Sequence, residues 1–283
     1  MKKAHSVQRR ISRSRTAVQR QAHAAPNVVR DRQYVVAANW KMNLTVPDAT
    51  LLAEKYSAMD VPRSVTTVVC PSFTALIPVR DKIAGTGLNL GAQDVFWETL
   101  GAYTGEVSAD ELLSIGCRYV IIGHSERRRE SGETDQIVNR KVFTALGHHL
   151  SPILCVGESL EERSMRHHLF TVMRQVQRGL HNVPPPRKGQ ELVIAYEPIW
   201  AISPGGPATP HDAHEMAHMI QHALVDLFGE RIVRESTRVL YGGNVTPDNV
   251  GTFVDGEFVH GVLVGKDSLK VELFSAILNA LKR

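Results

Sequence analysis

The chain has 283 residues, of which 43% are hydrophobic and 22% charged, so it can bury a sizeable core and is neither disordered nor fibrous. No apolar run approaches the roughly 20 residues of a membrane-spanning helix, which excludes a transmembrane protein. Three scattered cysteines, Cys70, Cys117 and Cys155, form neither a disulfide framework nor a thiolate metal site, and this usage suits a reducing compartment.

The net charge of +4 divides unevenly along the chain. Residues 1–30 contain eight Lys or Arg and no acidic residue, whereas the remainder contains 25 basic and 29 acidic residues. Residues 1–33 are polar and lack a periodic apolar face, so we expect a disordered N-terminal extension. An Arg- and Ser-rich, acid-free start is also typical of an organelle transit peptide, and that alternative stays open. Beyond it only residues 127–129 cluster basic charge, so we expect no nucleic-acid partner.

From residue 34 onward, short apolar runs rich in β-branched residues alternate with longer stretches of helical spacing. The runs predict eight strands, at 34–39, 66–70, 88–93, 119–123, 152–157, 192–197, 238–242 and 258–265. Recognisable start signals predict helices over 45–59, 108–116, 209–228 and 268–281. Strands this apolar are buried on both faces, as in a parallel sheet covered by helices.

Eight strand–helix units in the 250 residues from 34 to 283 predict an α/β fold, a single-domain (β/α)8 barrel of the TIM type. An open, doubly wound sheet is the runner-up. The Gly-x-Gly-x-x-Gly fingerprint that it would need after the first strand is missing. The barrel is therefore the favoured architecture.

Polar residues follow the predicted strands at their carboxyl ends, where the reactive residues of a barrel lie. The strand ends that carry them are Asn39-Trp40-Lys41, Gly123-His124-Ser125-Glu126, Tyr196-Glu197-Pro198, Gly242-Gly243-Asn244 and Gly265-Lys266. A carboxylate, an imidazole, an ammonium and an amide would meet there, beside glycine-rich turns whose N–H groups can cradle an anion. The combination suits proton abstraction beside the carbonyl of a phosphorylated substrate. Taken singly, Lys41 or Glu197 is more often a salt-bridge partner at a strand end, and His124 is more often a hydrogen-bonded structural histidine.

Five motifs, in chain order, resemble those of the triosephosphate isomerase family: Asn39-Trp40-Lys41-Met42-Asn43, residues 121–128 (IIGHSERR), 155–159 (CVGES), 195–202 (AYEPIWAI) and Tyr241-Gly242-Gly243. The match runs from about residue 34 to the C-terminus. It implies interconversion of glyceraldehyde 3-phosphate and dihydroxyacetone phosphate through an enediolate, in glycolysis, gluconeogenesis and the pentose shunt. It also implies no metal and no organic cofactor.

The resemblance assigns roles residue by residue. Glu197 resembles the general base, His124 the neutral imidazole that polarises the substrate oxygens, and Lys41 the fixed cation. The implied substrate-binding residues are Asn39, Lys41, Ser203, Asn244, Gly265 and Lys266. The implied supporting and lid residues are Glu126, Cys155, Glu158, Trp200 and Tyr241. Because a phosphorylated enediolate must be shielded from water, a lid is expected over residues 198–208, which Tyr241 and Glu158 would latch.

The segment 91–106 resembles the family's long loop after the third strand, which reaches into a neighbouring subunit. The resemblance implies a homodimer with Thr104 at the loop tip and Gln93 and Glu133 at the interface. By itself, the segment is equally a long surface loop. The expected location is the cytoplasm, or an organelle if residues 1–33 are a transit peptide.

The chain departs from the family pattern at three places. The lid tip, usually Ile-Gly-Thr-Gly-Lys, reads ISPGGP at residues 202–207, while Asn244 replaces a common Ser and Lys266 replaces a Gly. Proline fixes φ and removes an amide donor, so the mechanics of the lid are expected to differ. These changes leave three interpretations: an ordinary family member, an isomerase of another short ketose phosphate such as a four-carbon erythrulose phosphate, or an inactive phosphate-binding or structural protein.

Residues 214–218 (HEMAH) match the His-Glu-x-x-His pattern of zinc proteases, and His211 and His222 continue the same helical face. The segment follows the sixth strand and falls on the outer ring of the predicted barrel, away from the strand ends. A metalloprotease is therefore not expected, and the remaining alternative is an incidental surface metal site.

Overall fold

The computed structural model describes residues 34–202 and 208–282, so both the N-terminal extension and the predicted lid tip, including Ser203, lie outside the described residues. Eight parallel strands, hydrogen-bonded in sequence order, close into a barrel, and β1 pairs with both β2 and β8. The strands are β1 (Tyr34–Asn39), β2 (Val65–Cys70), β3 (Asn89–Ala92), β4 (Tyr119–Ile122), β5 (Ser151–Val156), β6 (Leu192–Tyr196), β7 (Thr237–Tyr241) and β8 (Gly261–Val264).

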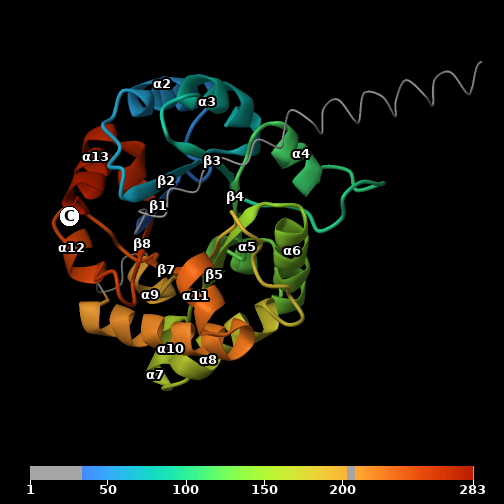
Figure 1. The fold of residues 1–283 in the computed structure, drawn as a ribbon, viewed down its shortest axis with the longest axis vertical. Helices are drawn as coiled ribbons and strands as arrows, with labels where there is room; N and C mark the ends of the chain where they lie inside the picture. Colours follow the sequence, from blue (N-terminus) through green and yellow to red (C-terminus); the bar gives the residue numbers. More distant parts are fainter. Residues whose placement is uncertain (1–33, 203–207, 283) are drawn as a thin grey trace, which may run out of the picture.

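Helices surround the strands as an outer ring (Figure 1). They are α2 (Val46–Ser57), α3 (Leu76–Ile83), α4 (Ala109–Ser114), α5 (Ser125–Glu130), α6 (Asp135–Gly147), α7 (Leu160–Ser164), α8 (His168–Gly179), α9 (Ile199–Ile202), α10 (Pro210–Phe228), α11 (Glu230–Ser236), α12 (Val250–Phe253) and α13 (Val271–Ala280), with 3₁₀ turns η1 (Phe73–Ala75) and η2 (Lys266–Leu269). The predicted (β/α)8 barrel is confirmed. None of the described helices is both long and apolar enough to cross a membrane.

Local side-chain chemistry fixes where the helices begin. The N-cap residues Thr45, Ser108 and Thr209 each accept a hydrogen bond from the backbone three residues on, and each stands at or beside the predicted start of its helix. The last predicted helix instead divides into η2 and α13. Its first residue, Ser268, turns its amide and hydroxyl back onto the Gly265 carbonyl and forms a separate 3₁₀ turn.

The predicted eighth strand is shorter than its apolar pattern suggests. It begins at Gly261 rather than at residue 258. One oxygen of Asp255 accepts hydrogen bonds from the amides of Glu257, Phe258 and Val259, each at 2.9 Å. Those amides are therefore used in a turn and are not free for strand pairing.

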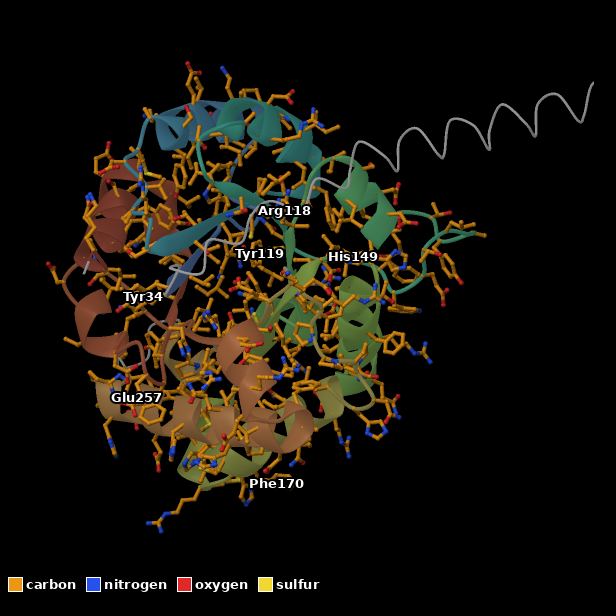
Figure 2. All side chains as sticks on the ribbon, viewed as in Figure 1. Tyr34, Arg118, Tyr119, His149, Phe170 and Glu257 are labelled. Carbon is orange, nitrogen blue, oxygen red and sulfur yellow. The ribbon has the colours of Figure 1, made fainter. Side chains whose placement is uncertain are left out.

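Successive side chains along each strand point alternately into the barrel and outward toward the helices, so the core has two layers. In β1, Val35 and Ala37 face the barrel interior, whereas Val36 and Ala38 pack against the helices. The interior is filled by Val35, Ala37, Val68, Cys70, Tyr119, Ile121, Ile153, Cys155, Val193, Ala195, Leu240 and Leu263. Figure 2 shows Tyr119 well inside the ring of helices and Phe170 at its outer edge. A filled barrel leaves no room for a ligand on its axis, so a substrate must bind at one end.

Candidate active site

The loops after β1, β4 and β6 bring three predicted catalytic residues into one chain of contacts. The Lys41 ammonium lies 2.6 Å from Glu126 Oε1, and the other oxygen of Glu126 lies 3.6 Å from His124 Nδ1. The opposite ring nitrogen of His124, Nε2, lies 3.0 Å from Glu197 Oε1. The carboxyl ends of these strands therefore place a cation, an imidazole and a carboxylate side by side.

Glu197 is a buried carboxylate with both oxygens engaged. Oε1 faces His124, and Oε2 accepts a hydrogen bond from the Ser125 amide at 3.1 Å. Burial raises the pKa of Glu197, but the charge and hydrogen bond of His124, with the amide of Ser125, lower it by more. Glu197 is therefore held as a carboxylate, the form that can accept a proton.

His124 begins α5 and caps it with its own ring. Nδ1 accepts a hydrogen bond from the Glu126 amide at 3.2 Å, so that nitrogen presents its lone pair and the ring proton stands on Nε2. Burial lowers the pKa of His124, and the neighbouring Glu197 carboxylate raises it by more, giving a net increase. The increase depends on contact with Glu197, whereas the amide at Nδ1 favours the neutral ring. Separation of the pair would remove the charge of Glu197 that raises the pKa of His124, and so would favour the neutral ring with its proton on Nε2.

Lys41 has a left-handed backbone, at φ 52°, which few non-glycine residues in the described part of the chain adopt. Its amide donates to Asn39 Oδ1 at 3.0 Å, and its carbonyl accepts from the Gln93 side chain at 2.9 Å. Gln93 also donates to the carbonyl of Cys70 at 2.9 Å and so ties the ends of β1 and β2 together. Backbone strain at a functional position persists only where such contacts enforce it.

The loops after β7 and β8 form the remaining wall of the mouth. A Cβ on Gly265 would stand 3.6 Å from Lys41 Cε, so the absence of a side chain keeps this wall open next to the ammonium. Asn244 and Lys266 are exposed. The loop that carries Asn244 is held by Asn249, whose amide donates to the Asn244 carbonyl at 3.0 Å and accepts from the Thr246 amide at 2.8 Å. A positively charged, glycine-lined wall of this kind suits a phosphate group.

The comparisons with known proteins agree with this geometry. A family model described as triosephosphate isomerase matches residues 34–281. The chain belongs to the triosephosphate isomerase family. It is 44% identical over 248 residues to the triosephosphate isomerase of Moorella thermoacetica, covering 88% of this chain and 98% of the relative. The relative from Chloroflexus aurantiacus is 45% identical over 246 residues, covering 87% of this chain and 98% of its own. The protein is accordingly an aldose–ketose isomerase.

Cys155, a supporting residue implied by the resemblance, and Gly157 both pack against Glu197. The Cys155 thiol is buried next to Glu197, and burial, followed by the charge of Glu197, raises its pKa well above the usual value. Gly157 passes so close to the Glu197 carbonyl that a Cβ there would overlap it. Gln175 on α8 holds Gly157 by both of its peptide groups, at 2.7 and 3.0 Å.

The buried carboxylate of Glu158 is the centre of a cluster that includes Trp200 of α9. Glu158 Oε1 accepts from the Trp200 indole at 2.8 Å, from the Tyr196 hydroxyl at 3.1 Å and from Arg163 at 3.2 Å. Tyr241 lies apart, stacked on Phe253 with ring centroids 4.1 Å from one another. The predicted latch between these groups and the lid involves residues outside the described range.

The structure of the single chain shows the exposure and contacts of the three residues expected at a subunit interface. Thr104 is exposed in the connection between β3 and α4. Gln93 supports Lys41, as described above. Glu133 is buried and bonds both Lys141 and Arg127 at 2.5 Å.

Several supporting residues carried no sequence signal. Gln175 lies 18 residues from Gly157, and Arg163 lies 49 residues from Asp212, whereas Asn249 holds Asn244 and Thr246 within five residues of itself. Gln93 is the last residue of a predicted strand and directly follows the observed β3, so the rule that found Lys41 could have assigned it to the site. Within residues 34–202 and 208–282, no group of three or more His, Cys, Asp or Glu side chains is arranged around a metal position.

Proposed function

We propose that this protein interconverts glyceraldehyde 3-phosphate and dihydroxyacetone phosphate, with Glu197 as the base, His124 as the hydrogen-bond donor and Lys41 as the cation. The observation that carries the proposal is the pair formed by Glu197 Oε1 and His124 Nε2, 3.0 Å apart at the mouth of the barrel. Substrate entering between them would contact an ionised carboxylate on one side and an N–H donor on the other.

Glu197 removes the proton from the carbon beside the carbonyl and returns it to the neighbouring carbon. An α-proton is far too weak an acid for a carboxylate in water, so the reaction requires stabilisation of the oxygen that becomes negative. The N–H of His124 and the ammonium of Lys41 provide that stabilisation. Because Nδ1 of His124 accepts from the Glu126 amide, the ring is oriented to donate from Nε2.

Lys41 also attracts the dianionic substrate. Its ammonium stands beside the glycine-lined wall at Gly265, where the phosphate would lie, and Asn39 fixes its backbone. Asn244 and Lys266 extend the wall, and the exposed ammonium of Lys266 adds charge next to the anion. Ser203 and the other lid residues remain predictions.

The test is kcat/KM for the purified protein on glyceraldehyde 3-phosphate and on erythrulose 4-phosphate, with Glu197→Gln as the matched inactive variant. The amide keeps the size of the carboxylate and cannot accept the proton, so activity should fall by at least about a thousandfold. A poor triose rate with a good four-carbon rate would assign the enzyme to the longer substrate. Tight binding of a substrate analogue without turnover of either sugar would contradict the isomerase proposal.

We further propose a homodimer built on the connection between β3 and α4. This segment extends beyond the ring of helices (Figure 1). It carries the exposed apolar residues Leu100 and Tyr103, and Met42, beside Lys41, is 94% exposed. If these side chains come together in one apolar patch, that patch would suit a protein–protein interface. Sizing by light scattering should give twice the 31.3 kDa chain mass, and an active monomer at low concentration would contradict the dimer.

We infer a cytoplasmic location, because the three cysteines are free and buried, as suits a reducing compartment. The alternative is an organelle, if residues 1–33 act as a transit peptide. Fusing residues 1–33 to a fluorescent protein would separate the two locations.

A further inference from the structure

We propose that His218 and His222, on the outer surface of α10, form a chelating site for a divalent transition-metal ion. This site is separate from the active site and lies beyond the proposed isomerase function. Residues 214–218 match the zinc-protease pattern in sequence, but the structure pairs His218 with His222, the histidine one turn further on.

The distance between the two rings fits a shared ion. His218 Nε2 and His222 Nε2 lie 3.0 Å apart, and both side chains are exposed. Two imidazole nitrogens at about 2.0–2.1 Å from one metal ion and 3.0 Å from each other subtend about 95° at that ion. This angle is close to that of adjacent ligands in tetragonal Cu²⁺ and Ni²⁺ complexes. A metal ion can therefore replace the proton that now bridges the rings with little movement of either side chain.

The surroundings hold the pair in position. The ring of Phe258 packs against His218 with centroids 4.8 Å apart and planes at 71°. The Gln221 amide donates to the carbonyls of Glu257 and Phe258, at 2.9 and 3.2 Å, which fastens this loop to α10. Figure 2 shows Glu257 at the edge of the molecule, where solvent can supply the remaining ligands. One ring is thus oriented before metal binds, which reduces the entropic cost of chelation.

The remaining histidine of the zinc-protease pattern, His214, contacts a different part of the chain. His214 Nε2 lies 2.8 Å from the Phe253 carbonyl and 3.6 Å from Asp255. It therefore points toward α12 and the turn after it, so the sequence pattern of a zinc protease is not assembled. The site has two protein ligands, and water completes the coordination, so exchangeable binding of the ion is expected.

Charge favours a cation at this surface. Glu215 and Asp226 stand three residues before His218 and four after His222, which places both on the same helical face. Affinity for such nitrogen ligands rises from Ni²⁺ to Cu²⁺ and is lower for Zn²⁺. Cu²⁺ is accordingly the tightest probe, and Ni²⁺ the one best suited to calorimetry.

The test is calorimetric titration of the full-length protein with Ni²⁺ and electron paramagnetic resonance with one equivalent of Cu²⁺. Variants His218→Ala and His222→Ala are compared with His214→Ala, a matched control on the same helix. All three retain every other histidine, including those of residues 1–33. Isomerase activity and far-ultraviolet circular dichroism verify that each variant is folded.

The proposal predicts one Ni²⁺ site that weakens at least tenfold in His218→Ala and in His222→Ala but persists in His214→Ala. The Cu²⁺ spectrum should show hyperfine splitting from two nitrogens, reduced to one in either single variant. Unchanged Ni²⁺ binding in the His218 and His222 variants would overturn the site. Equal loss in His214→Ala would overturn the proposed two-histidine site, because His214 would then also be a ligand.

Discussion

The guanidinium carbon of Arg163 lies 4.6 Å from the centroid of the Trp200 ring. The same guanidinium bonds Glu158 at 3.2 Å and also bonds Asp212, near the start of α10. Trp200 belongs to α9, which ends at Ile202, whereas α10 begins at Pro210. One side chain thus joins the two described segments on either side of residues 203–207 and fixes both to the buried carboxylate of Glu158.

Replacing this guanidinium should destabilise the protein. We expect Arg163→Met to lower the free energy of unfolding by about 2 kcal/mol, because Glu158 loses the cation paired with it. Arg163→Lys should recover only part, since an ammonium cannot stack on the indole and bond two carboxylates at once. Urea denaturation measures both, with Arg178→Met on the exposed face of α8 as the control. A loss no larger than that of the control would mean that Arg163 is an ordinary surface residue.

The left-handed backbone of Lys41 predicts a separation of stability from activity. Lys41→Gly and Lys41→Ala both remove the ammonium, so both should lose most of the isomerase activity. At φ 52° a Cβ makes an unfavourable steric contact that alanine has and glycine lacks. Glycine also has more freedom in the unfolded chain, which offsets part of this gain. After this offset, Lys41→Gly should be about 0.5–1 kcal/mol more stable than Lys41→Ala. Equal thermal stability of the two variants would show that no strain is stored there.

The barrel, and the grouping of Lys41, His124 and Glu197 at one end of it, could be predicted from the sequence because both follow from local patterns. Apolar runs spaced by helices give the strand order, and the polar residues at or just beyond the ends of the runs include Lys41, His124 and Glu197. Contacts that depend on tertiary packing left no such trace. Gln175 lies 18 residues after Gly157 in the sequence. Only the folded structure shows that its side chain hydrogen-bonds both the N–H and the carbonyl of Gly157. The His218–His222 pair likewise depends on which of several helical histidines turn toward each other.

A buried ionic cluster beside the site predicts a large loss of stability. Lys141 is almost completely buried and lies 2.7 and 2.8 Å from the two oxygens of Asp94 and 2.5 Å from Glu133. Lys141→Met would leave two buried carboxylates without this cation, so we expect a loss of about 3–5 kcal/mol in the free energy of unfolding. The exposed pair of Lys82 with Glu54 provides the control, since Lys82→Met should cost less than about 1 kcal/mol. Similar losses in urea denaturation would contradict the assigned role of burial.

The closure between β7 and β8 predicts sensitivity to acid. These strands share a single register pair, and His260 extends their contact by donating its amide to the Val239 carbonyl at 2.7 Å and accepting the Val239 amide at Nδ1, 3.1 Å away. Burial, with the nearby charge of Arg238, lowers the pKa of His260 to about 4. The folded state therefore keeps the ring neutral below pH 6.5, where the unfolded chain already binds a proton.

The contribution of neutral His260 to the free energy of unfolding is complete above pH 6.5 and is lost as the pH falls toward 4. At about 1.4 kcal/mol per pKa unit, the free energy of unfolding should fall by about 2 kcal/mol between pH 7.5 and pH 5.0. His260→Asn keeps a hydrogen-bond acceptor that does not titrate, so its stability should fall by about 2 kcal/mol less than that of the natural chain over this interval. The exposed His222→Asn should behave as the natural chain does. Parallel loss of stability in the His260 variant, measured by urea denaturation at both pH values, would show that the acid sensitivity arises elsewhere in the barrel.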